Sequence, residues 1–145
     1  MIQIREGIFE TNSSSTHSIS LGDGFEMSID TSWCPDRDGV IKVDGHEFGW
    51  DQETYNEAEY KVSYAWIIVR DWSEDEKEKR HELLDAVIMA QTGATEVWYE
   101  PKEGYIDHQS VDCDQMGWLF EDVDTLRNFI FNRDSWLETD NDNYQ

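Results

Sequence analysis

The sequence predicts an α+β fold in a single domain over residues 1–145, with about three helices beside a mixed or antiparallel sheet. The length of 145 residues lies within the roughly 100–200 residues of one ordinary domain. Apolar residues alternate in the first part of the chain and recur at helical spacing from Asp51 onward. The predicted helices are grouped beside predicted hairpins, and this order favours α+β over a doubly wound α/β sheet.

Alternating or β-branched segments in the N-terminal part predict strands over residues 2–9, 16–21, 40–43 and 46–50. Glycine, proline and several aspartates between the second and third of these segments predict a long loop over residues 22–39. The dipeptide Asp44–Gly45 favours a tight β-turn, so we expect the third and fourth strands to form a hairpin.

Helical spacing of apolar residues predicts helices over residues 52–72, 74–92 and 122–132. We expect their N-terminal caps at Asp51 for the first helix, at Ser73 with Glu76 in a capping box for the second, and at Asp122 or Asp124 for the third. Gly93 is placed to end the second helix. Three further strands are expected over residues 96–99, 105–107 and 136–138, the first two joined as a hairpin through residues 101–104.

The charge balance excludes several classes of function. The chain has 33 acidic residues against 11 lysines and arginines, a formal net charge of −22 and a pI of about 4.2. Phosphates and anionic lipids would be repelled, so we expect no direct nucleic-acid partner and no membrane partner. Aromatic residues make up 13% of the chain, and disordered chains are poor in them, so a packed core is expected.

Other features of the sequence argue against membrane insertion, export and a disulfide framework. No apolar run approaches the roughly 18–20 residues of a membrane helix, and the charged opening MIQIREGIFE differs from a signal peptide. Cys34 and Cys113 are the only cysteines, and neither lies in a C-x-x-C pair that would indicate a zinc site. We therefore expect a cytoplasmic protein with reduced thiols and no cofactor.

A polar segment near the N-terminus, Thr11–Ser18, contains hydroxyl side chains and an imidazole. Its candidate site residues are Ser13, Ser14, Ser15 and His17. Hydroxyls and backbone N–H groups in a turn can bind an anion such as phosphate, and a serine near a histidine can act as a nucleophile with its base. The alternative is a serine-rich turn whose hydroxyls bond to their own backbone.

A second polar segment, Tyr105–Ser110, contains the candidates Asp107, His108 and Ser110. On a strand, His108 and Ser110 share one face and Asp107 lies on the other. We expect this strand to lie beside the first polar segment, so that His17 and His108 reach common hydroxyls in a Ser/His/Asp site. The alternative is a strand end with a hydrogen-bonded histidine.

A third polar segment near the C-terminus alternates aspartate and asparagine, and its candidate metal ligands are Asp140 and Asp142. Oxygen ligands of this kind suit Ca²⁺ or Mg²⁺. The glycine and the distal glutamate of an EF-hand loop are missing, so no EF-hand is predicted. The alternative is a solvated acidic tail.

The segment Phe9–Ser18, which reads FETNSSSTHS, resembles a pattern of small bacteriophage and bacterial proteins of unassigned function. The segments Tyr105–Ser110 and Asp140–Asn143 are similar to the same group. The resemblance implies a phage or mobile-element setting, and it favours a single site built from the polar segments. It implies no established activity.

Two functions are compatible with these features. The first is a phage-encoded binding protein that engages a basic surface of a host protein, as a nucleic-acid mimic or inhibitor. Acidic residues spread along the chain favour it because they create a strong negative field, although acidity also serves solubility alone. The second is a small hydrolase or nucleotide-processing enzyme that uses the serine, histidine and aspartate residues above, but the same field would repel nucleotide substrates.

Overall fold

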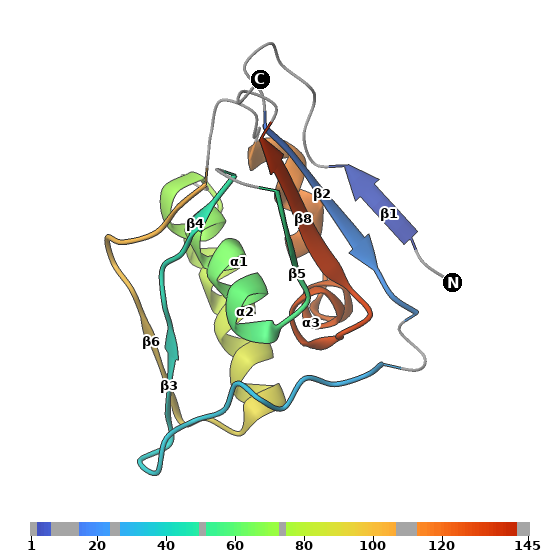
Figure 1. Ribbon diagram of the computed structural model, residues 1–145. Helices are drawn as coiled ribbons and strands as arrows, with labels where there is room; N and C mark the ends of the chain where they lie inside the picture. Colours follow the sequence, from blue (N-terminus) through green and yellow to red (C-terminus); the bar gives the residue numbers. More distant parts are fainter. Residues whose placement is uncertain are drawn as a thin grey trace.

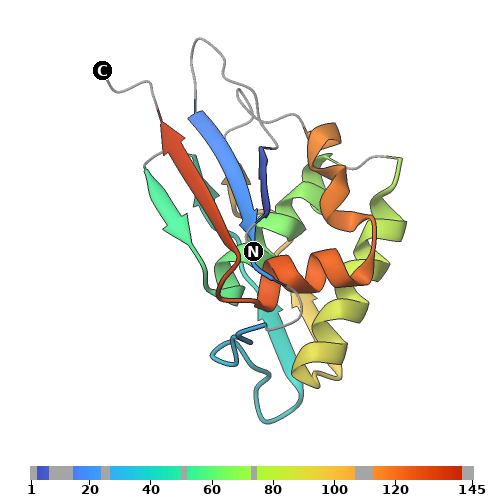
Figure 2. The ribbon, with the colours of Figure 1, turned by 90° about the vertical axis from the view of Figure 1, so that its right-hand side faces the viewer.

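Helices and three small sheets make up the described part of the chain, as the predicted α+β fold requires (Figure 1). The computed structural model describes residues 3–6, 15–23, 27–49, 52–72, 75–106 and 113–141. Figure 2 shows the helices gathered on one side of the largest sheet.

The largest sheet is antiparallel, with the strand order β1-β2-β8-β5. Its strands span Gln3–Glu6 (β1), Ser15–Leu21 (β2), Trp136–Asn141 (β8) and Glu53–Tyr55 (β5). Ile19 of β2 lies opposite Leu137 of β8, and both side chains are fully buried, so this face of the sheet covers the core. The structure confirms the strands predicted within residues 2–9, 16–21 and 136–138. The last of them lies inside the sheet, between β2 and β5.

Two short parallel pairs lie on the other side of the molecule from this sheet (Figure 1). Strand β3 (Val40–Val43) pairs with β6 (Glu96–Tyr99), and β4 (Glu47–Phe48) pairs with β7 (Tyr105–Ile106). The strands themselves were predicted, but both predicted hairpins are wrong, because each strand pairs with a segment from the other half of the chain.

The two segments expected to be hairpin turns lie against each other between these parallel pairs. The N–H group of Tyr105 donates to the carbonyl oxygen of His46 at 2.8 Å. A Cβ atom at Gly45 would collide with the backbone carbonyl of Glu103. Glycine is therefore needed at residue 45 for the close approach of two backbones, and not for a tight turn.

The helices span Ala58–Trp72 (α1), Lys77–Thr92 (α2) and Val123–Phe131 (α3), with a 3-10 helix at Cys113–Phe120 (η2) that the sequence did not predict. The predicted start of the first helix at residue 52 is wrong, because Glu53–Tyr55 form β5. The expected cap at Asp51 lies outside the described residues. The backbone N–H of Ala58 instead donates to the carboxylate of Asp30 at 2.7 Å.

The ends of α2 and α3 test the other predicted caps. Helix α2 begins after Glu76, three residues later than the predicted start at residue 74, and Glu76 makes no side-chain cap hydrogen bond. Ser73 of the predicted capping box lies outside the described residues. Gly93 ends α2 in a left-handed conformation with φ of 78°, as predicted. Asp122 caps α3 by accepting a hydrogen bond of 2.7 Å from the N–H of Thr125.

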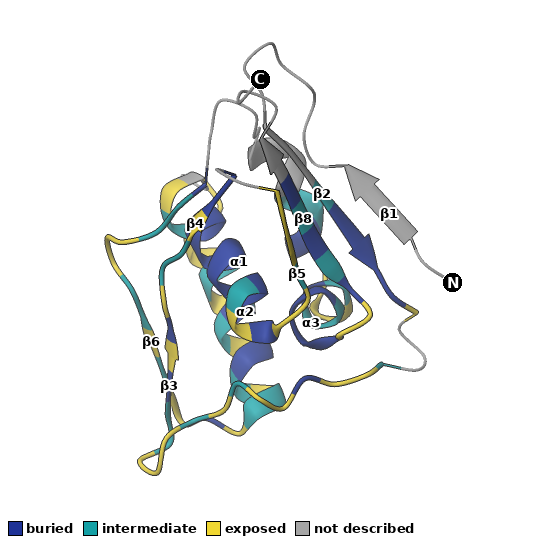
Figure 3. Ribbon diagram, viewed as in Figure 1, coloured by how far each residue is buried: buried dark blue, intermediate teal, exposed yellow. Residues whose placement is uncertain are grey.

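Helix α1 runs through the centre of the core. Residues 61–69 are all buried, so the helix is surrounded on every side and not only along one stripe (Figure 3). It contacts α2, α3, η2 and the strands β3 and β7. Within the described residues, no helix is long and apolar enough to cross a membrane.

Candidate functional site

The structure brings the first and third predicted polar segments together. In the register of β2 and β8, Ser15 lies opposite Asn141 and His17 lies opposite Thr139. Asp140 lies between these two partners on β8, opposite Thr16. The candidates Ser15, His17 and Asp140 therefore lie on two adjacent strands, and Asp140 belongs to β8.

Strand β2 pairs with β1 and β8, and β7, the described start of the second polar segment, pairs with β4 in a different sheet, so β2 and β7 do not pair with each other. His108 lies outside the described residues, and the expected approach of His17 and His108 stays a prediction. The remaining candidates lie outside the described residues: Ser13, Ser14, Asp107, His108, Ser110 and Asp142. The enzyme hypothesis depends on these residues and stays a prediction. Within the described ranges, no group of three or more potential ligands is arranged to hold a metal ion.

A buried network around Asp30 joins the long loop to α1. The carboxylate accepts hydrogen bonds from the N–H and hydroxyl groups of Ser32, at 2.8 and 2.6 Å, as well as from Ala58. Arg133 pairs with it at 3.0 Å. Burial alone would raise the pKa of Asp30, but the hydrogen bonds from Ser32 and Ala58, together with the Arg133 charge, lower this pKa to about 2.

Lys61 of α1 lies in the same network with no exposed surface. Its ammonium group donates to the carbonyl oxygens of Asn132 and Ser135, at 2.7 and 2.8 Å. Burial lowers the pKa of Lys61 to about 7, against the opposing effect of the Asp30 charge. Because no ligand can reach this ammonium group, the network is a structural junction of the loop, α1, α3 and β8, and not a binding site.

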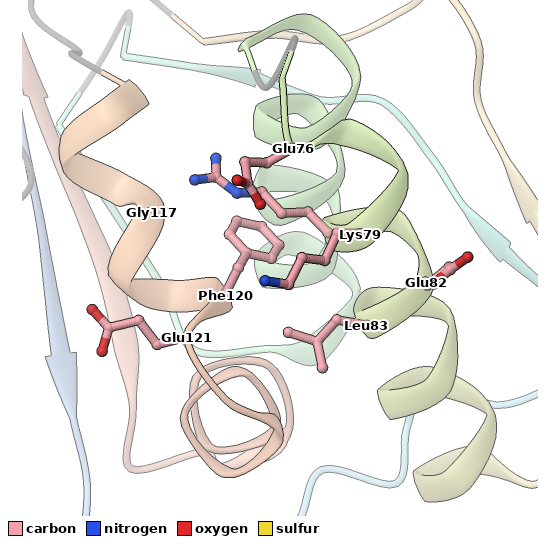
Figure 4. Close-up of a pocket in the computed structure, with 8 residues that line it drawn as sticks. Glu76, Lys79, Glu82, Leu83, Gly117, Phe120 and Glu121 are labelled. Atoms are coloured by element: carbon pink, nitrogen blue, oxygen red, sulfur yellow. The ribbon is translucent and has the colours of Figure 1, made fainter.

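One accessible hollow is a groove between α2 and η2, with a volume of about 520 Å³ (Figure 4). The guanidinium of Arg80 lies 5.4 Å from the centroid of the Phe120 ring, which is within the range of a cation–π contact. The Lys79 side chain extends toward Phe120, and Glu82 points away from the groove. Two cationic side chains therefore lie in this groove, on a protein that is otherwise strongly acidic.

A second accessible hollow is a pocket of about 280 Å³ on the other flank of α2, facing β6. It is lined by His81, Glu82 and Asp85 of α2 and by Val97 and Tyr99 of β6. The Tyr99 hydroxyl donates to Asp85 Oδ1 at 3.1 Å. Burial raises the pKa of Tyr99, and the charge and hydrogen bond of Asp85 raise it further, so the hydroxyl stays protonated.

The rings of His81 and Tyr99 form the aromatic floor of this pocket, and Trp66 packs behind them. The indole of Trp66 lies 4.4 Å from the Tyr99 ring and 5.3 Å from the His81 ring, measured between centroids. The His81 and Tyr99 rings meet edge to face at 4.7 Å. None of the residues that line this pocket was among the site residues predicted from the sequence. One signal was available, because His81 and Asp85 are one helical turn apart and so share a face of α2.

Exposed acidic side chains occur on β4, β5, β6 and all three α-helices. Asp30 is the one buried acidic residue among those whose side chains the structure describes. Exposed carboxylates occur on strands and helices alike, for example at Glu53, Glu59, Glu78 and Asp124. The surface is therefore acidic in many directions and not at one tail.

By its elements and sheet topology, the chain is an α+β protein. No family model, curated protein or solved structure matches it.

Proposed function

We propose that the protein is a binding protein whose acidic surface engages a basic surface of another protein. The observation that carries this proposal is the number and spread of the exposed carboxylates: among the acidic residues whose side chains the structure describes, Asp30 alone is buried. Of the cationic residues, Lys61 is fully buried. The guanidinium of Arg70 is held by the carbonyl oxygens of Glu103 and Gly104, at 2.6 and 3.0 Å, and by the Asp71 carboxylate.

The exposed charge is therefore strongly negative, as the formal net charge of −22 implies. A strong negative field increases the association rate with a positively charged surface and repels nucleic acid. Carboxylates held on a rigid body can also occupy positions that phosphates occupy on a nucleic acid. We therefore infer that the partner is a protein whose basic groove binds DNA or RNA. The resemblance of residues 9–18 to bacteriophage proteins would make it a protein of the bacterial host.

The test is chromatography of a bacterial lysate on the immobilised protein, with and without an excess of double-stranded DNA. We expect the retained proteins to be basic nucleic-acid-binding proteins, and we expect DNA to prevent their retention by filling the same groove. A triple variant, Glu53→Gln, Glu57→Gln and Glu59→Gln, should retain a smaller amount of these basic proteins. It removes three exposed carboxylates that lie close together in sequence around the start of α1. Retention of neutral or acidic proteins, or retention unaffected by DNA, would contradict the proposal.

A further inference from the structure

We propose that the pocket between α2 and β6 receives one lysine or arginine side chain of the basic partner. This inference rests on the proposed function and specifies where the partner makes its central contact. The pocket combines the two features that bind an organic cation, because aromatic rings form its floor and two carboxylates, those of Glu82 and Asp85, line it.

The aromatic floor suits a cation because the faces of aromatic rings carry negative electrostatic potential. An ammonium or guanidinium group is attracted when it lies within roughly 6 Å of a ring centroid. Tyr99 lines the pocket, and Trp66 packs against it at 4.4 Å. The Trp66 indole N–H also donates to the carbonyl oxygen of Glu100 at 2.7 Å, so the floor is fixed before a ligand arrives.

The carboxylates supply the charge. Oδ1 of Asp85 accepts a hydrogen bond from the Tyr99 hydroxyl. An ionised carboxylate has about four lone-pair positions, so Asp85 can accept further hydrogen bonds from a cation. Tyr99 also holds the Asp85 side chain in a defined orientation. Arginine is well suited to such a site because its planar guanidinium can both stack on a ring and bond to a carboxylate.

The size of the pocket restricts its occupant. Small-molecule sites usually measure roughly 300–1,000 Å³, and this pocket, at about 280 Å³, lies just below that range. One side chain is therefore a better fit than a nucleotide. The groove between α2 and η2 is lined by Lys79 and Arg80 besides its glutamates, whereas no lysine or arginine lines the pocket beside β6, so we expect cations to select the β6 side.

The first experiment uses n-butylguanidinium as the probe and follows the full-length protein by ¹H–¹⁵N NMR. We expect saturable shifts at the Trp66 indole N–H and at the backbone of residues 81–85 and 97–99. The neutral isostere n-butylurea should cause no such shifts. Asp85→Asn can still accept the Tyr99 hydroxyl but loses the charge, and it should weaken binding about fivefold. Glu78→Gln removes the same charge from the same helix outside the pocket and should change binding less than about twofold.

Three results would overturn the inference: no saturable shift, shifts centred elsewhere, or equal weakening by Asp85→Asn and Glu78→Gln. A second arm separates this failure from failure of the proposed function. The affinity of a decalysine peptide for wild type, Asp85→Asn and Glu78→Gln is measured by fluorescence anisotropy. If decalysine binds tightly and both variants weaken its binding equally, the proposed function of the acidic surface stands and the proposed role of the pocket is rejected. Probe binding in the pocket without decalysine binding would reject the proposed function.

Discussion

The carboxylate of Asp30 accepts a hydrogen bond of 2.7 Å from the backbone N–H of Ala58 and so fastens the loop before β3 to the first turn of α1. A negative charge at a helix N-terminus is favourable because backbone N–H groups there lack partners within the helix. Arg133, which follows α3, pairs with the same carboxylate. One buried side chain therefore connects three parts of the chain that are far apart in sequence.

Replacing Asp30 by asparagine should lower the free energy of unfolding by about 2–3 kcal/mol at neutral pH, because Arg133 and the helix terminus lose their anionic partner. Asp38→Asn, an exposed change in the same loop, should change it by less than about 0.5 kcal/mol. Urea unfolding monitored by circular dichroism measures both variants. Equal stabilities of the two variants would contradict the role assigned to Asp30.

The same carboxylate makes stability depend on acid pH. Its pKa is lowered from 3.8 to about 2 in the folded state, so its contribution is complete above about pH 4 and is lost as the pH falls through 2. The difference in unfolding free energy between wild type and Asp30→Asn should therefore shrink by about 2 kcal/mol between pH 4 and pH 2. A difference that stays constant over this range would show that the Asp30 carboxyl has an ordinary pKa.

Lys61 should make stability depend on pH in the alkaline range. Its pKa is lowered from 10.5 to about 7, so between these values the unfolded chain binds the proton more tightly than the folded protein. Wild type should therefore gain stability relative to Lys61→Met as the pH rises from 7 to 10, by up to about 1.4 kcal/mol for each pH unit. Parallel pH profiles of the two proteins, measured by urea unfolding, would contradict a lowered pKa.

The glycine contact between the parallel pairs gives a prediction with a matched control. Gly45→Ala should destabilise the protein by about 2–3 kcal/mol, because the added methyl group meets the backbone of Glu103. Gly93→Ala should cost only about 1 kcal/mol, because that residue has a positive φ but open space around it. Unfolding midpoints in urea compare the two. A smaller effect at Gly45 than at Gly93 would show that the two backbones do not meet.

Local patterns predicted the fold class, most strands and the positions of the helices, because these depend on the spacing of apolar residues over short segments. Pairing partners were not predictable in this way. Asp44–Gly45 has the composition of a hairpin turn, but the strand after it pairs with residues more than fifty positions away. The start of α1 was misplaced for a similar reason. The N–H group of Ala58, at the start of the helix, donates to Asp30, which is far from it in sequence.

The candidate site was less predictable than the fold. Sequence reasoning selected segments rich in serine, histidine and aspartate, and β-sheet register brings two of those segments together at His17 and Asp140. The pocket at Tyr99 went unnoticed because its lining comes from α2 and β6, and Trp66, which packs against Tyr99, belongs to a different helix. Such a site exists only after long-range packing, and no single segment carries its pattern.

The salt dependence of partner binding tests most directly whether the exposed carboxylates drive recognition of a basic surface. The measurement is the dissociation constant of the purified complex, by calorimetry, at about 50 mM and about 500 mM sodium chloride. Charges on an exposed surface are screened beyond roughly 8–10 Å at physiological ionic strength and more strongly at higher salt. We expect the dissociation constant to rise at least about tenfold over this range. A complex that is equally tight at both salt concentrations would contradict it.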